Sequence, residues 1–154
     1  MPRATCSCCL RPQGVCICHF VTPTPHATEV LILQHPLEEH HAKNTGRLLH
    51  LSLPRSRLVV GEVFDAVALQ ALMPEPRYTV LLYPPRQYPD HAAPDALDAH
   101  QLADPAKVRL VVLDATWRKS RKMLHLSPAL QGLPRLALDA LPERRYAIRK
   151  AHQP

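Results

Sequence analysis

The residues with the clearest capacity for chemistry lie in one stretch, residues 113–124, which reads LDATWRKSRKML. Asp114 stands one residue past an apolar run, and the only tryptophan of the chain, Trp117, follows three residues later. At 100° per residue, the helix predicted after Asp114 has an apolar stripe beside a stripe of cations. These cations are Arg118, Arg121, Lys122 and His125. A carboxylate at a strand end can accept a proton during catalysis, and a cationic helix face can bind phosphates.

A purely structural interpretation of the same stretch stays open. Aspartate before a helix is a common N-cap, so Asp114 can serve as the cap while Trp117 packs in the core and the cations are solvated. The position of the carboxylate at a strand end and the four clustered cations favour a functional site.

All five cysteines of the chain fall within its first eighteen residues. A disulfide framework would spread its cysteines along the chain, so this cluster indicates a reduced, intracellular metal site. One C-x-x-C pair and one C-x-C pair supply four thiolates for a tetrahedral Zn²⁺: Cys6, Cys9, Cys16 and Cys18. Such a zinc is structural, because no coordination position stays open, and it stabilises a knuckle too small to bury a core. Cys8 is then spare and His19 can replace a cysteine in principle; reactive or incidental cysteines are the alternative.

A histidine-rich segment precedes and enters the helix predicted over residues 38–53. Its metal-ligating residue types are His35, Glu38, Glu39, His40 and His41. A metal hydrolase motif H-E-x-x-H needs histidines four residues apart with a glutamate directly after the first, whereas Pro36 follows His35. A solvated helix start is therefore the better interpretation. The basic face of this helix either contacts phosphates or is merely solvated, and it comprises Lys43, Arg47 and His50.

Short apolar runs bounded by turn residues predict the strands that position these groups. They cover residues 29–34, 58–60, 78–83 and 108–113, with a weaker strand at 133–138. Helices are predicted over residues 38–53, 65–72, 94–102 and 114–126. This alternation favours an α/β fold, with a mostly parallel sheet and helices on both faces. Ligands of such sheets bind at the carboxyl ends of the strands, here around Gln34, Tyr83 and Asp114.

Length and charge set outer limits on the function. The 154 residues suit one compact domain, and the apolar runs are far shorter than the roughly 18 residues that span a bilayer. The start of the chain has no apolar signal-peptide core, so we expect a cytoplasmic protein. The formal net charge of +6 stays positive even if four thiolates surround one Zn²⁺. A polyanionic partner is expected, with nucleic acid the first candidate.

Motifs in order along nearly the whole chain resemble those of one family, the DTW-domain proteins, which are tRNA-uridine aminocarboxypropyltransferases. The namesake Asp-x-Thr-Trp motif is residues 114–117. The other matches are Cys6-x-x-Cys9-x-x-Pro12 with Cys16-x-Cys18, Gln34-His35-Pro36, Asn44-Thr45-Gly46-Arg47-Leu48, Leu82-Tyr83-Pro84-Pro85, Arg121-Lys122-Met123, Leu133-Pro134-Arg135 and Tyr146-x-x-Arg149. Each match alone is weak, and together they are highly specific.

The resemblance implies both a fold and a reaction. It implies an S-adenosylmethionine-dependent enzyme related to the SPOUT class, whose C-terminal part forms a trefoil knot. The implied reaction transfers the 3-amino-3-carboxypropyl group to N3 of a uridine in tRNA and leaves methylthioadenosine. The expected partner is therefore tRNA, with no membrane and no protein partner.

The resemblance also implies roles for individual residues. Asp114 would take the N3 proton, and Trp117 would stack on a base or wall off the sulfonium. The S-adenosylmethionine site would comprise Tyr83, Pro84, Asp114, Thr116 and Trp117. RNA phosphates would contact Lys43, Arg47, Arg118, Arg121 and Lys122.

One departure from the family pattern concerns the end of the chain. The family continues past the Tyr-x-x-Arg motif into further helices, whereas this sequence stops at Pro154. We therefore expect a zinc knuckle over residues 1–20 and a C-terminally short DTW α/β domain over residues 21–154, in which the knot can be incomplete. The alternative function is a non-catalytic zinc-knuckle RNA-binding module, which would bind tRNA without S-adenosylmethionine.

Overall fold

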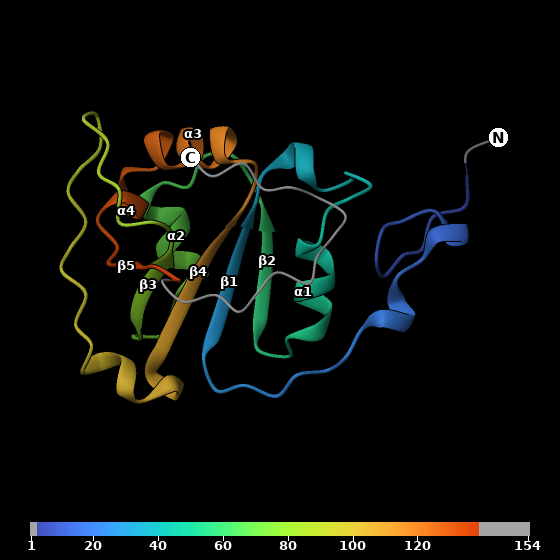
Figure 1. Cartoon of the computed structure of the whole chain (residues 1–154), viewed down its shortest axis with the longest axis horizontal. Helices are drawn as coiled ribbons and strands as arrows, with labels where there is room; N and C mark the ends of the chain where they lie inside the picture. The colour runs from blue at the N-terminus through green and yellow to red at the C-terminus, as the bar shows by residue number, and fades with distance from the viewer. Residues whose placement is uncertain (1–2, 139–154) are drawn as a thin grey trace.

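The computed structural model describes residues 3–138 as an α/β fold (Figure 1). Its strands are β1 (Glu29–Gln34), β2 (Ser56–Val60), β3 (Tyr78–Leu82), β4 (Val108–Asp114) and β5 (Arg135–Leu136). Its α-helices are α1 (Gly46–Ser52), α2 (Ala66–Leu72), α3 (Trp117–Leu126) and α4 (Pro128–Gln131). Short 3-10 helices cover Gln13–Val15, Cys18–Phe20, Pro36–Glu38, Gln101–Ala103 and Pro105–Lys107. The expected knot and the Tyr146 motif lie outside the described residues.

The five strands form one sheet in the order β2-β1-β4-β3-β5, and every pair is parallel. This confirms the predicted α/β class. The chain leaves β1 toward β2 at one edge of the sheet and leaves β4 toward β5 at the other edge. The strand order therefore reverses between the neighbours β1 and β4, which makes their carboxyl ends a topological switch point where ligands of such sheets bind.

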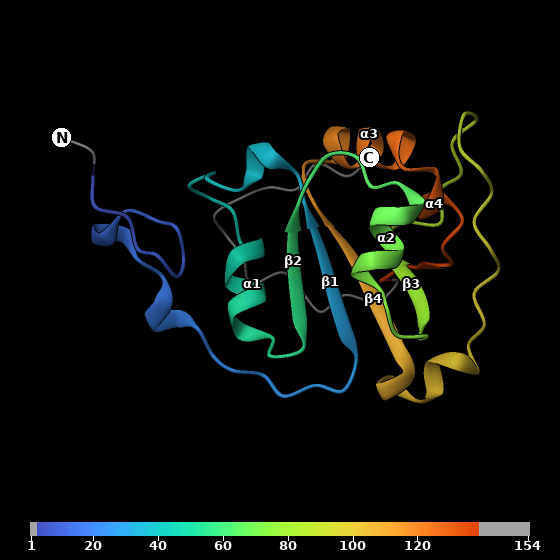
Figure 2. The same cartoon turned by 180° about the vertical axis from the view of Figure 1, so that it is seen from behind.

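Helices cover both faces of the sheet, as predicted. On one face, the strands pack alternate residues against α2, α3 and α4, and this core includes Leu31, Leu33, Leu81, Val111, Leu69, Met123, Leu124 and Leu130. On the other face, α1 lies against β1 and β2. In the rear view of Figure 2, α2 lies between the viewer and the sheet. In both views α3 lies across the carboxyl ends of the strands. We call this end the carboxyl edge.

Two of the predicted helices differ from the structure. The prediction over residues 38–53 is wrong in its first half, because a 3-10 turn and a loop precede α1, which begins at Gly46. Residues 94–102 form no α-helix, and only Gln101–Ala103 make a 3-10 turn. The backbone N–H of Asp95 donates to the carbonyl of Gly132 instead of to a helical neighbour, at 2.9 Å.

An ion-pair network closes the amino end of the sheet. Arg109 is only 2% exposed, and its Nε donates to Oε1 of Glu29 at 2.6 Å. Arg77 Nε lies 2.9 Å from the other oxygen of Glu29. Burial acts to raise the pKa of Glu29, but Arg109 and then Arg77 outweigh it, so the pKa is lowered.

None of the helices within residues 3–138 is long and apolar enough to cross a membrane.

Candidate active site and metal centre

The carboxylate of Asp114 stands at the switch point of the sheet. It ends β4 directly opposite Gln34, the last residue of β1. Gln34 Nε2 donates to Asp114 Oδ2 at 2.7 Å, and Asn44 Nδ2 donates to the same oxygen at 2.8 Å. Within the described residues, Oδ1 of Asp114 makes no hydrogen bond. The carboxylate is thus held in one orientation with one oxygen available to a ligand.

The first turn of α1 is pressed against this carboxylate. A Cβ on Gly46 would lie 2.2 Å from Asp114 Oδ2, so only glycine fits there. Asn44 is buried, and its Oδ1 accepts the backbone N–H groups of Gly46 at 2.9 Å and Arg47 at 3.3 Å. Asn44 therefore orders the start of α1 with its oxygen and holds Asp114 with its nitrogen. This double use explains why α1 begins at Gly46 and not earlier.

The N-cap interpretation of Asp114 is wrong. The residue that caps α3 is Thr116, whose Oγ1 accepts the backbone N–H of Lys119 at 3.3 Å. The capping role of Thr116 leaves the Asp114 side chain free to serve the site.

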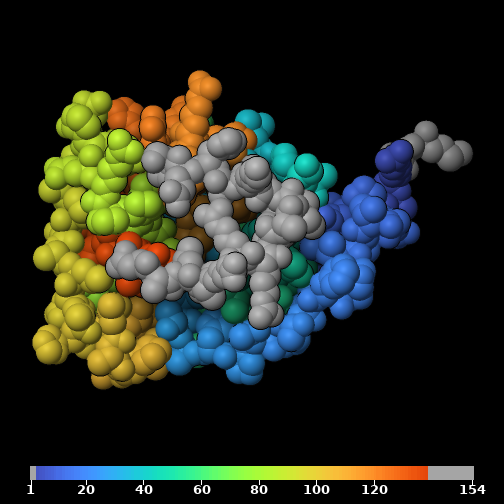
Figure 3. Space-filling model, viewed as in Figure 1, coloured from blue at the N-terminus to red at the C-terminus, as the bar shows by residue number. Residues whose placement is uncertain are grey.

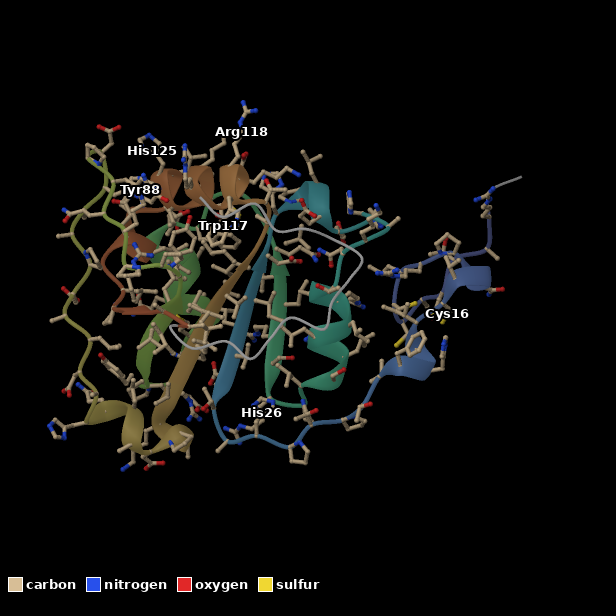
Figure 4. The ribbon with its side chains drawn as sticks, in the orientation of Figure 1. Cys16, His26, Tyr88, Trp117, Arg118 and His125 are labelled. Carbon is tan, nitrogen blue, oxygen red and sulfur yellow. The ribbon has the colours of Figure 1, made fainter. Side chains whose placement is uncertain are left out.

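An aromatic pair lies beside Thr116. The rings of Tyr83 and Trp117 meet edge to face, with centroids 5.7 Å apart. Trp117 is 40% exposed, so the alternative that placed it in the core is wrong. Tyr83 is buried, its hydroxyl lies 3.1 Å from Ser120 Oγ, and burial raises its pKa to about 12. Tyr83 is therefore a neutral, fixed wall. Trp117, which is labelled in Figure 4, leaves part of its indole exposed to a ligand.

Arg135 is a candidate site residue that the sequence matched to a family motif without assigning a role. Its guanidinium carbon lies 5.5 Å from the centre of the Tyr83 ring, which also contacts Trp117. Its Nη2 donates to the Gln131 carbonyl at 3.2 Å, whereas its Nε and Nη1 are buried and have no hydrogen-bond partner within residues 3–138. Burial lowers its pKa. A buried cation with unpaired N–H groups is costly unless a ligand supplies an acceptor.

A cationic cavity of about 660 Å³ opens over the outer face of α3. Its lining includes Arg118, Arg121, Lys122, His91 and His125. Arg121 lies 5.5 Å from the centre of the Tyr88 ring, and Lys122 Nζ lies 2.8 Å from Glu62 Oε1. Arg118 and His125 point away from the sheet (Figure 4). The predicted cationic stripe of α3 is thus exposed along one wall of a cavity.

The other two predicted phosphate ligands lie elsewhere. Lys43 is exposed in the loop before α1, whereas Arg47 is in the first turn of α1 and donates its Nε to the carbonyl of Cys8 at 2.9 Å. His50 Nδ1 lies 2.8 Å from Ser56 Oγ, and burial and then Arg47 lower its pKa. The structure therefore brings together the three α3 cations and does not bring Lys43 and Arg47 to them.

A second groove of about 470 Å³ reaches Asp114 from the face of the sheet that carries α1. Its lining is mostly apolar and includes Ile32, Leu48, Leu49 and Val112. An apolar groove that ends on a carboxylate suits a ligand with an apolar body and a polar or cationic end.

The histidine-rich segment does not assemble a metal site. His35 is buried, accepts the Leu37 backbone N–H through Nδ1 at 3.1 Å, and places Nε2 3.4 Å from Glu62. His40 and His41 are exposed. Across the described part of the chain, one group of side chains brings its metal-ligating atoms together, and it consists of cysteines alone.

That group is the predicted set of Cys6, Cys9, Cys16 and Cys18, whose sulfurs all lie within 4.8 Å of one another. The Cys6 and Cys18 sulfurs are 3.7 Å apart, and those of Cys9 and Cys16 are 3.6 Å apart. A tetrahedral zinc with Zn–S bonds of about 2.3 Å holds its sulfurs about 3.8 Å apart, so the residues fit a metal. Cys8 is exposed outside the group, and the His19 ring lies tilted against Phe20, with ring centroids 4.0 Å apart.

The chemistry of the four thiols also fits a cation. The Ile17 backbone N–H, which donates to Cys9, lowers the pKa of that thiol to about 6. Contacts with the Cys16 and Cys6 sulfurs raise the pKa of Cys18. Thiols crowded this closely cannot all ionise by themselves, and a bound divalent cation offsets their repulsion.

Fold and site together define an α/β protein of the doubly wound class, with a ligand-binding switch point at β1 and β4 and an N-terminal cysteine cluster that can hold a metal ion. The DTW domain family matches residues 3–154 of the chain, and the chain belongs to that family.

Curated relatives carry names that describe one activity. The chain is 30% identical over 154 residues to tRNA-uridine aminocarboxypropyltransferase A of Arabidopsis thaliana. This alignment covers 89% of this chain and 57% of the relative. It is 32% identical over 160 residues to tRNA-uridine aminocarboxypropyltransferase 2 of Drosophila melanogaster. That alignment covers 96% of this chain and 59% of the relative. The chain thus spans little more than half the length of these relatives. No solved structure matches it.

Proposed function

We propose that this chain forms the catalytic domain of a tRNA-uridine aminocarboxypropyltransferase, which uses S-adenosylmethionine to make 3-(3-amino-3-carboxypropyl)uridine. The observation that carries the proposal is the Asp114 carboxylate at the switch point, which is fixed through Oδ2 and has no hydrogen bond to Oδ1 from residues 3–138. The relatives' names support the reaction class. A tRNA substrate and a reduced thiol cluster favour a cytoplasmic location.

The sulfonium of the donor is already reactive, so the enzyme mainly has to position the correct substituent of its sulfur against the nucleophile. A sulfonium carries three carbon substituents, and the one presented to the nucleophile is transferred. The bond between uridine N3 and the aminocarboxypropyl carbon forms as the carbon–sulfur bond breaks. The electron pair of that bond returns to sulfur, which leaves neutral methylthioadenosine. The N3 proton has to go to a base.

Asp114 is the base in this proposal. Oδ1 is the oxygen left for the N3 proton, because Gln34 and Asn44 occupy Oδ2. Thr116 keeps the chain turn after β4 in place by capping α3. Uridine N3 becomes a good nucleophile only when it loses its proton, so a fixed acceptor beside it is the catalytic contribution of the chain.

The donor lies against the aromatic pair in this proposal. Tyr83 and Trp117 exclude water from the sulfonium, and Pro84 fixes the turn after Tyr83. The α-carboxylate of the transferred group needs a cation, and Arg135, which lies against Tyr83, has two nitrogens without an acceptor among the described residues. Arg135→Met is expected to weaken S-adenosylmethionine binding in calorimetry. Its cost in melting temperature should be small, because the side-chain hydrogen bond that it removes is the one from Nη2 to the Gln131 carbonyl at 3.2 Å.

The tRNA lies over α3 in this proposal. Arg118, Arg121 and Lys122 line the cavity there and can contact phosphates, while exposed Lys43 is further away in the loop before α1. A zinc on the four cysteines supplies a structural cross-link and no chemistry at the reacting atoms.

The test is Asp114→Asn in a transfer assay with tRNA and S-adenosylmethionine labelled in the carboxypropyl chain. We expect at least a hundredfold loss of labelled tRNA, with binding of S-adenosylmethionine retained. Asp104→Asn is the matched control, because this aspartate lies at the amino end of β4 and caps a 3-10 turn. A wild-type rate for Asp114→Asn would show that another group is the base.

The cationic cavity equally supports a second function, a non-catalytic RNA-binding module. Calorimetry separates the two functions. Binding of S-adenosylmethionine to the wild-type chain supports the transferase, and tRNA binding without S-adenosylmethionine binding supports the module.

A further inference from the structure

The cysteine loop, residues 6–18, is joined to the chain around Asp114 by two reciprocal hydrogen bonds. Arg11 of the loop donates Nη2 to the carbonyl of Asn44 at 2.6 Å. In the opposite direction, Arg47 of α1 donates Nε to the carbonyl of Cys8 at 2.9 Å. We call this pair of bonds the arginine bracket. Figure 3 shows the loop lying against the segment that precedes α1.

The bracket ends on the residue that holds the catalytic carboxylate of the proposed function. Asn44 receives the Arg11 bond on its backbone carbonyl and directs its side chain to Asp114 and to the first turn of α1. Asn44 is 8% exposed, so its carbonyl has little access to water that could replace Arg11. Arg47 is in turn the residue whose N–H the Asn44 side chain accepts.

The conformation of the cysteine loop depends on its sulfurs. Cys9 is its only buried apolar side chain, so the loop lacks a core. Two backbone hydrogen bonds close the turn around the first cysteine pair. The Cys6 N–H donates to the Arg11 carbonyl at 2.8 Å, and the Leu10 N–H donates to the Cys6 carbonyl at 2.9 Å. Leu10 has φ of 60°, a left-handed conformation that a non-glycine residue adopts at a cost. A metal on the four sulfurs holds this loop and therefore the Arg11 side chain.

From these contacts we infer that Arg11 and Arg47 are positioning residues. Through them, a metal bound to the cysteine cluster orients Asn44, and Asn44 in turn orients Asp114. The inference rests on the proposed function for the role of Asp114, but the mechanical link itself does not require any activity. The metal-loaded loop fixes the Asn44 carbonyl, and loss of the metal or of either guanidinium releases it.

Amide hydrogen exchange of the full chain measures this link directly. The N–H groups of Gly46 and Arg47 donate to the Asn44 side chain, so their exchange reports its position. We expect exchange about tenfold faster after chelation of the metal, and a similar change in Arg11→Met. Tenfold corresponds to about 1.4 kcal/mol, which is the size of one hydrogen bond to a charged group. Arg11→Lys keeps a donor and is expected to restore part of the protection.

Matched variants separate the bracket from general damage. Arg57→Met removes a bond of the same kind, from Nη1 to the Leu72 carbonyl at 3.0 Å, and is expected to leave residues 46 and 47 unchanged. Cys8→Ser keeps both the carbonyl and the metal ligands, and is expected to behave as wild type. In transfer assays, Arg11→Met should lower kcat and leave the KM for tRNA unchanged.

Unchanged exchange at residues 46 and 47 in both chelated protein and Arg11→Met would overturn the inference. If exchange responds as expected but the wild-type chain binds no S-adenosylmethionine, the proposed function fails while the mechanical link stands.

Discussion

Two carboxylates stand at opposite ends of the β1–β4 pair, and their surroundings differ. At the amino end, Glu29 faces Arg109 in register and pairs with two guanidinium groups, those of Arg109 and Arg77. At the carboxyl end, Asp114 faces Gln34 and receives its hydrogen bonds from two neutral amides. Within residues 3–138, Asp114 has no ion-pair partner.

The difference separates a structural charge from a functional one. The charge of partly buried Glu29 is neutralised by the two arginines, as expected for a structural ion pair. Asp114 is oriented by neutral amides and is not neutralised by a cation of residues 3–138. A carboxylate that the fold orients without neutralising is available to a ligand, and this supports our proposal that the carboxyl edge is the functional end.

The largest expected effect comes from breaking the structural pair. Arg109→Met leaves Glu29 with one partner in a partly buried site, and we expect a loss of about 3 kcal/mol in the free energy of unfolding, measured in urea. Binding of S-adenosylmethionine to the remaining folded protein should not change. The double variant Glu29→Gln/Arg109→Met is expected to recover part of the loss. If Arg109→Met lowered the free energy of unfolding by less than about 0.5 kcal/mol, the ion pairs at the amino end of the sheet would be no stronger than ordinary surface ion pairs.

A methyl group placed against the functional carboxylate comes next. Gly46→Ala puts a carbon inside the contact distance of Asp114 Oδ2, and we expect a cost of about 1–3 kcal/mol together with loss of transfer activity. Gly132→Ala is the control, because a Cβ there meets nothing within 4 Å. Equal melting temperatures and equal activity for the two variants would contradict the tight packing of α1 on Asp114.

A smaller effect is expected from one phosphate ligand. Arg118→Gln should weaken tRNA binding and reduce the slope of log K against log salt by about 0.7–0.9, with S-adenosylmethionine affinity unchanged. Lys107→Gln removes the same charge at the amino end of β4, where we expect no change in slope. If both variants altered the slope equally, the basic charge would act diffusely and not through the α3 cavity.

The smallest effect concerns acid stability. The pKa of Glu29 is lowered in the folded protein, so the unfolded chain takes up a proton first as the pH falls. The stabilisation by this pair is therefore complete above pH about 4.5 and is lost as the pH falls through the lowered pKa. Urea midpoints at pH 6 and at pH 3.5 should differ less in Glu29→Gln than in the wild type. An identical difference would show that Glu29 gains nothing from its arginines.

The sequence predicted the parts of this molecule that rest on local pattern. The strand over residues 29–34 is confirmed to the residue because its apolar run is continuous and flanked by polar residues. The cysteine ligands were predictable because the spacing of two chelating pairs already determines a tetrahedral set.

The parts that sequence pattern missed depend on contacts between distant residues. Helical periodicity ran through Asn44, and nothing local indicates that its side chain is committed to Asp114, seventy residues away. Thr116 caps α3 in place of Asp114, because strand β4 extends far enough to include the aspartate. Arg135 became a candidate only when the fold placed it over Tyr83.

The arginine bracket has a thermodynamic consequence for the intact protein. If metal binding favours the orientation of Asn44 that holds Asp114, linkage requires the Asn44–Asp114 contact to strengthen metal binding by the same factor. Asn44→Ala would then speed the extraction of zinc by a chelator. The cysteine cluster and the carboxyl edge would behave as one cooperative unit, in which loss of either weakens the other.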